Sequence, residues 1–390
     1  MNLRQRFLAL QSALDSHQAL WRAAPFYQRR PAWCEAWPDL AEAALGLDEQ
    51  RLEDLTGVPA ALGDWLAPRL PVVAELAELC ALPPLAARAL PPCGPHFDWE
   101  IPQRKREQIE AFARHGPAAR APLLEWCAGK GHLGRRLALG DGQPVSSLEI
   151  DPLLCAHAGR LAARARIAQS VLCGDALTAD ARRHVSGREV LALHACGELH
   201  RSLVRHAATD GARGYRIAPC CYYRGAAEGY RPLGRAAALP LDGSALRLAV
   251  TETVTAPRRI RQRLARDQAW KLGFIALRNA LLGEAERPFK PVSSTWLSGE
   301  FPAYGRFLAA REGLPLPERV DWAHWQAVGE ERRAAVRRLE LVRHAFRRGL
   351  EMWLVLDLAL GLEEAGFQVQ VGSFCERTLT PRNLLVLAER

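Results

Sequence analysis

The sequence predicts an α/β protein built on a doubly wound parallel sheet. The first observation is a short apolar run at Leu123 and Leu124 that leads into a Gly-rich turn and then into the start of a helix. The second is that four more strand-like runs follow, alternate with helical segments and end in polar or small residues. This alternation places the loops that follow the strands along one edge of the sheet. The four runs are Val145–Ile150, Val171–Cys173, Glu189–Leu193 and Tyr215–Ala218.

The Gly-rich turn has the pattern Glu-x-Cys-x-Gly-x-Gly-x-Leu. Glycine tolerates the positive φ of a tight strand-to-helix turn, and without a Cβ it lets a ligand approach the backbone. In an α/β sheet such a turn lies at the carboxyl end of the first strand, where nucleotide-like ligands bind. Together with Gly134, the turn has the glycine spacing of the dinucleotide pattern G-x-G-x-x-G, but its other residues do not favour dinucleotide binding. The candidate residues are Glu125, Cys127, Gly129, Lys130, Gly131 and Leu133.

Acidic residues end the next two strands. Glu149 lies about 20 residues past the glycines, where a carboxylate accepts hydrogen bonds from both ribose hydroxyls. Ile150 and Asp151 follow it, and Asp151 has a second interpretation as the cap of the next helix. After the third strand, Asp175 stands before Ala176 and is well placed for the amino group of an adenine.

Four motifs then stand in a fixed order, EWCAGKGHLG, LEID, LHACGEL and PCCYY, after the basic helix Gln103–Ile109. Together they resemble the methyltransferase domain shared by the methyltransferase-like proteins and by the glutathione S-transferase C-terminal domain-containing protein. The resemblance covers Pro102 to Cys221 and resumes at SFCERTLTPRNLLVLAE. It implies a Rossmann-like, seven-stranded class I methyltransferase sheet that ends in an antiparallel hairpin, Phe367–Phe374 and Asn383–Leu387.

The resemblance also implies a cofactor, S-adenosylmethionine (SAM), and a role for each candidate residue. Glu125 and the turn would lie along its methionine part, Glu149 would hold the ribose, Asp175 and Ala176 would face the adenine, and His194 would lie beside the methyl group. The predicted cofactor-binding residues are Glu125, Cys127, Gly129, Lys130, Gly131, Leu133, Glu149, Ile150, Asp151, Asp175, Ala176 and His194.

The loops after the fourth and fifth strands carry the candidate catalytic residues His194, Cys196, Cys220 and Cys221. His194 is either a base with a pKa near neutrality or a hydrogen-bonding residue that fixes its loop. Ala-Pro-Cys at 218–220 is similar to the motif of RNA 5-methylcytosine enzymes, whose Cys attacks the base, but Ile217 replaces the expected acid. A metal site is a third interpretation. Since adjacent cysteines rarely both ligate one ion in tetrahedral geometry, no metal ligand is predicted. A fourth is that these small residues only pack against the cofactor.

Outside the sheet, the sequence predicts mainly helices. Residues 1–95 are predicted to form a helical N-terminal domain, and residues 96–390 a methyltransferase domain with a helical insertion at about 224–364. The expected helices are Leu3–Arg22, Ala32–Leu45, Ala60–Leu66, Val72–Leu82, Ile260–Leu282 and Glu330–Gly349, with a turn at Thr56–Pro59 and a linker at Leu90–Pro95.

Charge is distributed unevenly. Residues 1–95 carry 8 Arg and no Lys against 11 Asp and Glu, which gives them a net charge of −3. Since the whole chain has a net charge of +9, the remaining residues have a net charge of +12. The excess is concentrated at Arg258–Arg263 and in the helix Arg332–Arg348. Such a surface attracts polyanions, RNA above all, and no DNA partner is expected. The alternative is a set of solvated helix faces with ion pairs along each helix.

Composition narrows the function classes. No run approaches the ~18 apolar residues of a membrane span, and the first residues carry no signal-peptide pattern. Ten irregularly spaced Cys suit reduced thiols in the cytoplasm better than a disulfide framework. Because 48 of the 52 basic residues are Arg, we expect a GC-rich bacterial source.

The sequence thus predicts a cytoplasmic SAM-dependent methyltransferase that acts on RNA, either rRNA or tRNA. A protein or small-molecule substrate is the alternative. A SAM-binding protein without transferase activity is another, because His194-Ala195-Cys196-Gly197 replaces the Asn/Asp-Pro-Pro-aromatic loop of many amino-methylating enzymes.

Overall fold

The computed structural model describes residues 1–94, 97, 100–251, 258–283, 289 and 292–390. Its contacts divide the chain into two compact units. The sheet unit comprises Met1–Ser16, Glu75–Glu252 and Arg347–Arg390, and the helical unit comprises His17–Ala74 and Thr253–Phe346.

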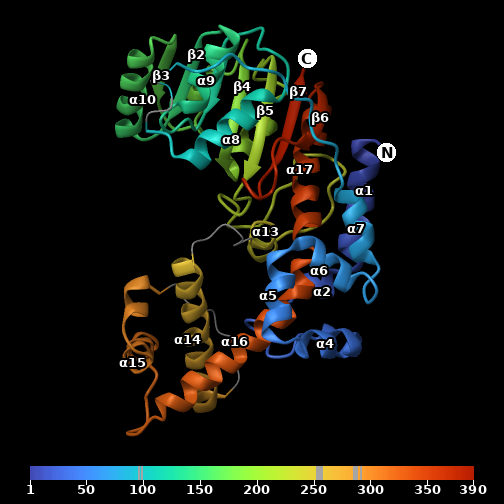
Figure 1. The fold of residues 1–390 in the computed structure, drawn as a ribbon, viewed down its shortest axis with the longest axis vertical. Coiled ribbons are helices and arrows are strands. Elements are labelled where there is room, and N and C mark those ends of the chain that lie inside the picture. The colour runs from blue at the N-terminus through green and yellow to red at the C-terminus, as the bar shows by residue number, and fades with distance from the viewer. Residues whose placement is uncertain (95–96, 98–99, 252–257, 284–288, 290–291) are drawn as a thin grey trace. The chain divides into compact units, whose positions relative to one another are not determined.

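Seven strands form one sheet in the order β3-β2-β1-β4-β5-β7-β6 (Figure 1). The first five strands run parallel, whereas β7 is antiparallel to both β5 and β6. This confirms the predicted α/β sheet with its closing antiparallel hairpin. The strands are β1 (Leu123–Trp126), β2 (Val145–Glu149), β3 (Gln169–Cys173), β4 (Glu189–Cys196), β5 (Gly214–Cys220), β6 (Gln368–Ser373) and β7 (Leu384–Glu389).

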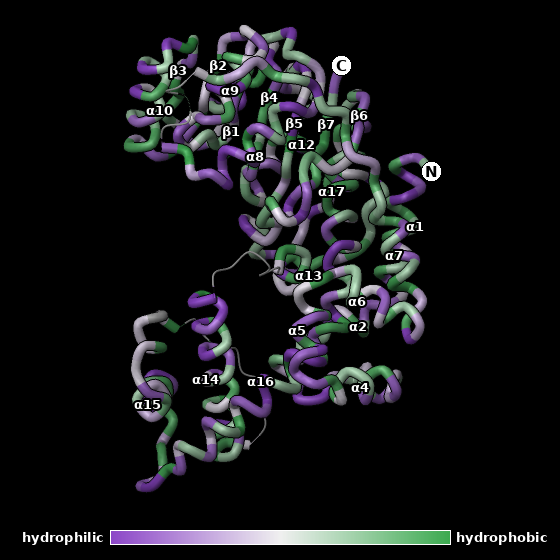
Figure 2. Tube along the Cα trace, in the orientation of Figure 1, coloured by the Kyte–Doolittle hydropathy of each residue, from purple (hydrophilic) through white to green (hydrophobic). Residues whose placement is uncertain are grey.

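Burial follows the position of each strand in the sheet. Every residue of the central strands β1 and β5 is buried, whereas the edge strand β3 has no fully buried residue. A parallel sheet is covered on both faces, so its inner strands are nearly continuous apolar runs. Figure 2 shows this for β4 and β7, which carry mainly hydrophobic residues. The loops at the carboxyl ends of the parallel strands are therefore attached to a buried, well-packed sheet.

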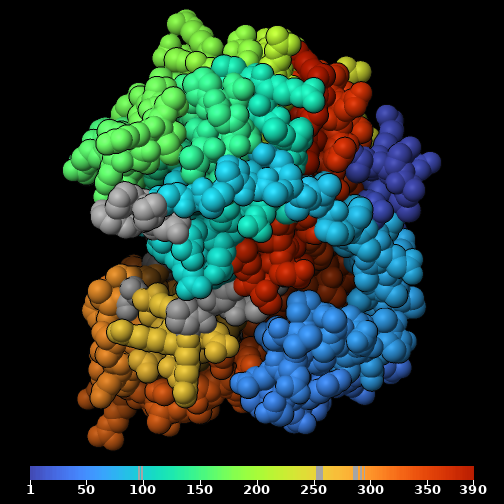
Figure 3. All heavy atoms as spheres, turned by 45° about the horizontal axis from the view of Figure 1, so that its top comes forward, coloured from blue at the N-terminus to red at the C-terminus, as the bar shows by residue number. Residues whose placement is uncertain are grey.

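Helices flank the sheet. The helix that follows β5 after the helical unit, α17, is buried from Gly349 to Leu362 and packs on β6 and β7. On the other side of the hairpin, Arg104 and Gln108 of α8 donate to the Leu379 carbonyl at 2.8 and 3.2 Å, and Figure 3 shows these segments side by side at the surface. The helices are α1 (Leu3–Ser16), α7 (Val72–Cys80), α8 (Gln103–Arg114), α9 (His132–Asp141), α10 (Pro152–Ala165), α11 (Ala179–Arg183), α12 (Glu198–His206), α13 (Gly243–Leu248) and α17 (Arg347–Glu364).

The helical unit is held by close helix crossings and an aromatic core. A Cβ on Gly273 of α14 would lie 2.5 Å from the Trp325 carbonyl of α16, so glycine allows the two helices to touch. Trp270, Phe301 and Tyr304 fill the core beside this crossing. The helices are α2 (Gln18–Arg22), α3 (Trp33–Ala36), α4 (Pro38–Leu45), α5 (Glu49–Gly57), α6 (Pro59–Leu66), α14 (Arg258–Leu282), the 3₁₀ helix η1 (Ser294–Ser298), α15 (Phe301–Glu312) and α16 (Trp322–His344).

Three predicted helices have wrong bounds. The predicted helix at 330–349 is two helices, because α16 ends at His344 and α17 begins at Arg347 after the fully buried Phe346. The predicted helix at 3–22 breaks at His17, and the one at 32–45 breaks at Trp37, ahead of Pro38. Proline tolerates the first turn of a helix and not its interior, which explains the break at Trp37.

Within residues 1–94, one helix escaped prediction. Helix α5 fills the interval before the predicted turn at Thr56–Pro59, and the Asp48 side chain caps it by accepting from the Arg51 N–H at 2.7 Å. An Asp before a helical segment is a common start signal.

The compact units divide the chain differently from the predicted domains at 1–95 and 96–390. Helix α1 packs on α17, where the Phe7 and Trp353 rings stack with centroids 5.2 Å apart. Helices α2, α4 and α5 instead pack on α16. The N-terminal region thus contributes to both units.

Candidate functional site

The Gly-rich turn joins β1 to α9 through left-handed backbone conformations. The φ angles of Cys127, Gly129 and Gly131 are +57°, +57° and +66°. A Cβ on Gly131 would collide with the side chain of Gln169, whereas a Cβ on Gly129 would meet nothing within 4 Å. The positive φ therefore favours glycine at 131, and the backbone at 129 is open to a ligand. Lys130 lies beside it, with its Nζ 3.7 Å from the Glu100 carboxylate.

Glu125 lies beneath the turn. Its side chain is buried, and its Oε2 accepts a hydrogen bond from the Ser147 hydroxyl at 2.8 Å and another from the Gly134 N–H. Burial raises the pKa of this carboxyl from 4.5 to about 7, against the opposing effect of these bonds. Leu133 is likewise buried, in the core between α9 and the sheet. The structure thus places both residues behind the turn, as its support.

Glu149 connects the end of β2 to the turn. Its Oε2 accepts from the Gly129 N–H at 2.7 Å, and its Oε1 accepts from the N–H groups of Ile150 and Asp151 at 3.0 and 3.1 Å. Asp151 has a different role here, because its carboxylate caps α10 by accepting from the Leu153 N–H at 2.8 Å. This matches the second interpretation of Asp151.

Beyond β3, Asp175 is exposed and Ala176 is buried. Asp175 Oδ1 accepts from the Leu177 N–H at 2.9 Å, which closes a tight turn. Large apolar side chains are exposed near these acids: Ile150 is 62% exposed, Leu177 50% and Leu153 80%. Sequence reasoning missed Leu153 and Leu177. Their signal was an apolar residue close after the acid that ends a strand.

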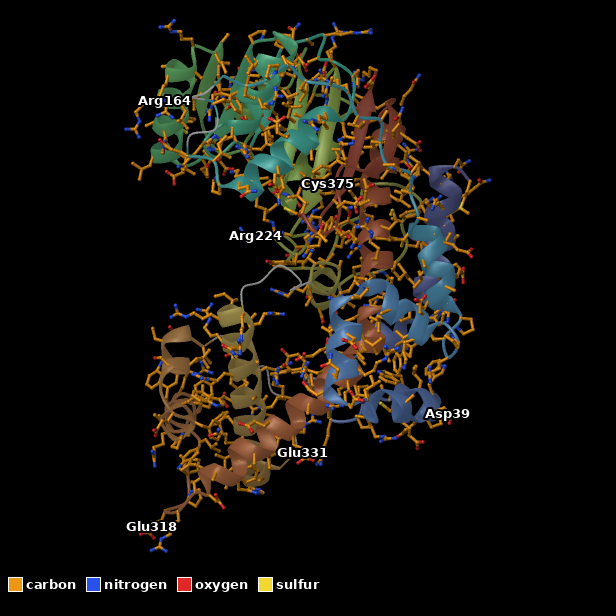
Figure 4. The ribbon with its side chains drawn as sticks, in the orientation of Figure 1. Asp39, Arg164, Arg224, Glu318, Glu331 and Cys375 are labelled. Carbon is orange, nitrogen blue, oxygen red and sulfur yellow. The ribbon has the colours of Figure 1, made fainter. Side chains whose placement is uncertain are left out.

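The loops after β4 and β5 are joined by backbone hydrogen bonds. The Gly197 N–H donates to the Cys220 carbonyl and the Glu198 N–H donates to the Arg224 carbonyl, both at 3.0 Å. Figure 4 places Arg224 at the carboxyl ends of these strands. A bulge in β4 shifts the register between Leu193 and Cys196, so Cys196 pairs directly with Cys220. The structure therefore brings Cys196, Cys220 and Cys221 together.

Backbone strain gathers in these loops. Among the described residues, five non-glycine residues have positive φ, and three of them are site candidates: Cys127, His194 and Cys221. Such conformations cost free energy and cluster at functional sites.

His194 is half-buried, and burial lowers its pKa from 6.5 to about 4. The positive charges of Arg382 and Lys105 lower this pKa as well. This lowered pKa favours the alternative role of a hydrogen-bonding residue over that of a base, because desolvation and two cations disfavour the imidazolium. His194 is a neutral imidazole at pH 7.

The three thiols at the strand ends share protons. Hydrogen bonds from Cys196 and Cys220 lower the pKa of the Cys221 thiol, and the positive charges of Arg224 and Arg382 lower it further. Hydrogen bonds with Cys196 and Cys221, together with burial, raise the pKa of Cys220. Of the candidate cysteines, Cys221 is thus the favoured thiolate, and Cys220, which the Ala-Pro-Cys motif singles out, is a buried thiol.

Cations from three distant segments act on this edge of the sheet. Lys105 of α8 lowers the pKa values of Glu125 and His194, and Arg382 and Arg224 act on Cys221. Lys105 and Arg224 are exposed. Sequence reasoning missed all three, because their convergence depends on how α8 and the β6–β7 loop pack.

The two predicted basic surfaces behave differently. In α16, Arg337 pairs with Glu49, and Arg338 and Arg343 donate to the backbone of Leu47 and Trp21. These arginines attach the N-terminal helices to α16, and Arg343 also pairs with Glu340 of its own helix. At the start of α14 the side chains of Arg258, Arg259, Arg261 and Arg263 are exposed.

Residues 104–227 match the sequence model of a family described as a methyltransferase domain. Over these residues the chain is therefore similar to a methyltransferase domain. The match runs from α8 past β5 and so includes the Gly-rich turn, the two acids and the thiol-bearing loops. The Rossmann-like sheet is the class I methyltransferase fold, which implies a SAM-type methyl donor.

Solved structures resemble this chain only distantly. The [4+2]-cyclase SpnF has 13% identity and a TM-score of 0.25, and the match covers 40% of this chain and 59% of the cyclase. An O-methyltransferase family protein from Burkholderia thailandensis has 12% identity and a TM-score of 0.32, with 85% and 71% covered. A search of curated proteins gave no match. Within the described residues, no helix is both long and apolar enough to cross a membrane.

Proposed function

We propose that the sheet unit binds SAM and transfers its methyl group to RNA, and that it is related to the methyltransferase-like proteins and to the glutathione S-transferase C-terminal domain-containing protein. The observation that carries the donor site is the pairing of an open glycine backbone with acids at two neighbouring strand ends. Gly129 has room for a ligand, and Glu149 and Asp175 follow β2 and β3.

The residues at this edge fit SAM. The Glu149 carboxylate is an acceptor suited to two ribose hydroxyls, and exposed Ile150 and Leu177 offer apolar contacts to the faces of an adenine. Asp175 would accept from the adenine amino group. When bound, SAM supplies the reactive methyl group, and the protein supplies orientation and a dry environment.

His194 would act by position. A base with a pKa of about 4 has little driving force to remove a proton from a substrate near neutral pH. As a neutral imidazole it can still accept a hydrogen bond and orient the group that attacks the methyl carbon.

The cations favour RNA as the substrate. Lys105, Arg224 and Arg382 act on the edge of the sheet where the methyl group would lie, and a charged side chain there neutralises a phosphate. The exposed arginines at the start of α14 add a second basic surface. All ten cysteines lie in described residues, and none of them is in a disulfide there. The cytoplasmic location remains part of the proposal.

The test is transfer of a labelled methyl group from SAM by the full chain. Transcripts of bacterial rRNA and tRNA, a protein extract and a metabolite extract are offered separately, and SAM binding is measured by calorimetry. We expect SAM binding and label in RNA. Label in protein or in metabolites alone would overturn the RNA proposal, and absence of SAM binding would overturn the donor site.

A charge variant tests the RNA contact. Lys105→Gln with Arg224→Gln removes two charges from the edge, and Arg160→Gln with Arg183→Gln removes two exposed charges elsewhere on the sheet unit. We expect only the first pair to weaken RNA binding, by about tenfold, with a salt dependence reduced by about 1.5 to 2 in log–log slope. Equal effects of both pairs would contradict a specific contact.

A second candidate function is SAM binding without transfer. The absence of an Asn/Asp-Pro-Pro-aromatic loop at 194–197 favours it. SAM binding without label in any of the three pools would support this function.

A further inference from the structure

Three sulfur atoms meet at the carboxyl ends of β4 and β5. The Sγ atoms of Cys196, Cys220 and Cys221 all lie within 4.8 Å of one another, and those of Cys196 and Cys220 are 3.5 Å apart. In a tetrahedral zinc site each sulfur lies about 2.3 Å from the metal, which puts sulfurs about 3.8 Å apart. The cluster is thus already near the spacing that one zinc ion requires.

The backbone explains how two adjacent cysteines face the same point. Successive side chains of a strand point to opposite sides, so Cys220 and Cys221 would diverge if β5 simply continued. Instead the strand ends at Cys220, and Cys221 takes a left-handed φ of +46°. This turn carries the second sulfur back toward the first and removes the geometric objection to paired ligands.

The loops that carry the sulfurs are held in place. Besides the two backbone bonds between the loops, Arg201 of α12 donates through Nη1 to the Tyr222 carbonyl at 2.7 Å and through Nη2 to the Arg224 carbonyl at 3.1 Å. A Cβ on Gly197 would collide with the Arg224 carbonyl, and one on Gly225 would lie 2.5 Å from Glu198 Cβ. The sulfur positions are therefore fixed before any ion arrives.

We propose that Cys196, Cys220 and Cys221 bind one Zn²⁺ ion. Thiolates are soft ligands that select zinc over magnesium or calcium. Among the described residues, no other His, Cys, Asp or Glu completes the cluster within the same radius. Three protein ligands with an open fourth position are typical of catalytic zinc sites, whereas structural sites have four.

The charges around the site suit this ion. Binding displaces the remaining thiol protons to water, and three thiolates with one Zn²⁺ carry a net charge of −1. The guanidinium groups of Arg224 and Arg382 act on Cys221 and offset that charge. The zinc site is independent of the proposed SAM binding and methyl transfer.

Metal content tests the proposal. The full chain is purified under reducing conditions without chelator, loaded with Zn²⁺, desalted and analysed by mass spectrometry for metals. We expect about one zinc per chain, and at least about tenfold less in Cys196→Ser, Cys220→Ser or Cys221→Ser. Cys173→Ser is the matched control, because Cys173 is exposed and outside the cluster. Equal zinc in all variants, or none in the wild type, would overturn the site.

Two measurements on the wild type test the zinc site even if the serine variants fail to fold. Co²⁺ titration should give thiolate-to-cobalt charge transfer and the visible bands of a tetrahedral ion. Alkylation followed by peptide mapping should show that Zn²⁺ protects these three cysteines and leaves Cys173 reactive. A Cys196–Cys220 disulfide in untreated protein, together with no metal uptake after reduction, would contradict the zinc site. It would indicate a thiol pair that forms a disulfide instead.

Discussion

The carboxylate of Glu149 accepts a hydrogen bond from the backbone N–H of Gly129, with oxygen and nitrogen 2.7 Å apart. This contact joins the end of β2 to the Gly-rich turn, so the residue proposed to hold the ribose also positions the backbone proposed to face the ligand.

Replacing Glu149 separates this role from that of its neighbour Asp151. Glu149→Ala should raise the SAM dissociation constant at least about tenfold, because both ribose hydroxyls lose their acceptor. Asp151→Ala should cost about 1 kcal/mol of stability through loss of the α10 cap and leave SAM affinity nearly unchanged. Calorimetry and thermal unfolding measure both. Equal losses of affinity would mean that Asp151 contacts the ligand.

Gly129 of the turn and Gly134 of helix α9 should respond differently to an added methyl group. Gly134→Ala places a Cβ 2.6 Å from Glu125 Oε2 and 2.7 Å from Val145 Cγ1, so we expect a loss of about 1 to 3 kcal/mol in unfolding free energy. Gly129→Ala meets open space and costs about 1 to 2 kcal/mol through its positive φ alone. Its larger effect should be on SAM affinity. Normal affinity in Gly129→Ala would place the ligand elsewhere.

Glu125 predicts a pH dependence of stability. Its folded pKa of about 7 lies above its ordinary value of 4.5. The protonated form is therefore favoured by folding: stability is greatest below the unfolded pKa, falls as pH rises between the two values, and stays low above about 7. At about 1.4 kcal/mol for each pKa unit, the loss amounts to about 3 kcal/mol.

Glu125→Gln should remove this loss. Denaturant unfolding at about pH 5 and about pH 8 should show a variant that is more stable than the wild type only at the higher pH. The exposed Glu107→Gln serves as the control. A variant less stable at both values would show that the charged carboxylate is stabilising.

His194, in contrast to Glu125, should add no pH dependence near neutral pH, and the property to measure is activity. Since its pKa is about 4, its protonation state is constant between about pH 5.5 and about pH 8. Transfer rates of the wild type and of His194→Gln should therefore have the same pH profile and differ only in height. An inflection near neutrality that disappears in the variant would make His194 the base.

Asp357 of α17 should be a determinant of stability. It is fully buried and accepts hydrogen bonds from the Tyr230 hydroxyl at 2.8 Å and from the N–H groups of Leu233 and Gly234 at 2.9 Å. Asp357→Ala leaves three donors without their acceptor, so we expect a loss of about 3 kcal/mol in denaturant unfolding. Glu363→Ala, on the exposed end of the same helix, should change little. A loss below about 1 kcal/mol for Asp357→Ala would contradict this.

The sheet was predictable because each strand is a short apolar run followed by residues that its loop requires. Helix α17 was harder to delimit, since a helix buried all round has no polar face to give it a phase. The convergence of Cys221 with Cys196 depends on one positive φ angle, which no sequence pattern marks. Lys105 and Arg382 meet at the site through packing of distant segments.

The position of β7 between β5 and β6 has a consequence for synthesis of the chain on the ribosome. Strand β5 is the last of the parallel strands, and one of its two edges stays unpaired until β7, Leu384–Glu389, emerges from the ribosome. At the usual elongation rate of about 5 to 20 residues per second, the intervening ~160 residues take on the order of ten seconds. During that interval the nascent chain exposes an apolar strand edge and its adjacent cysteines, so we expect a chaperone to bind it there.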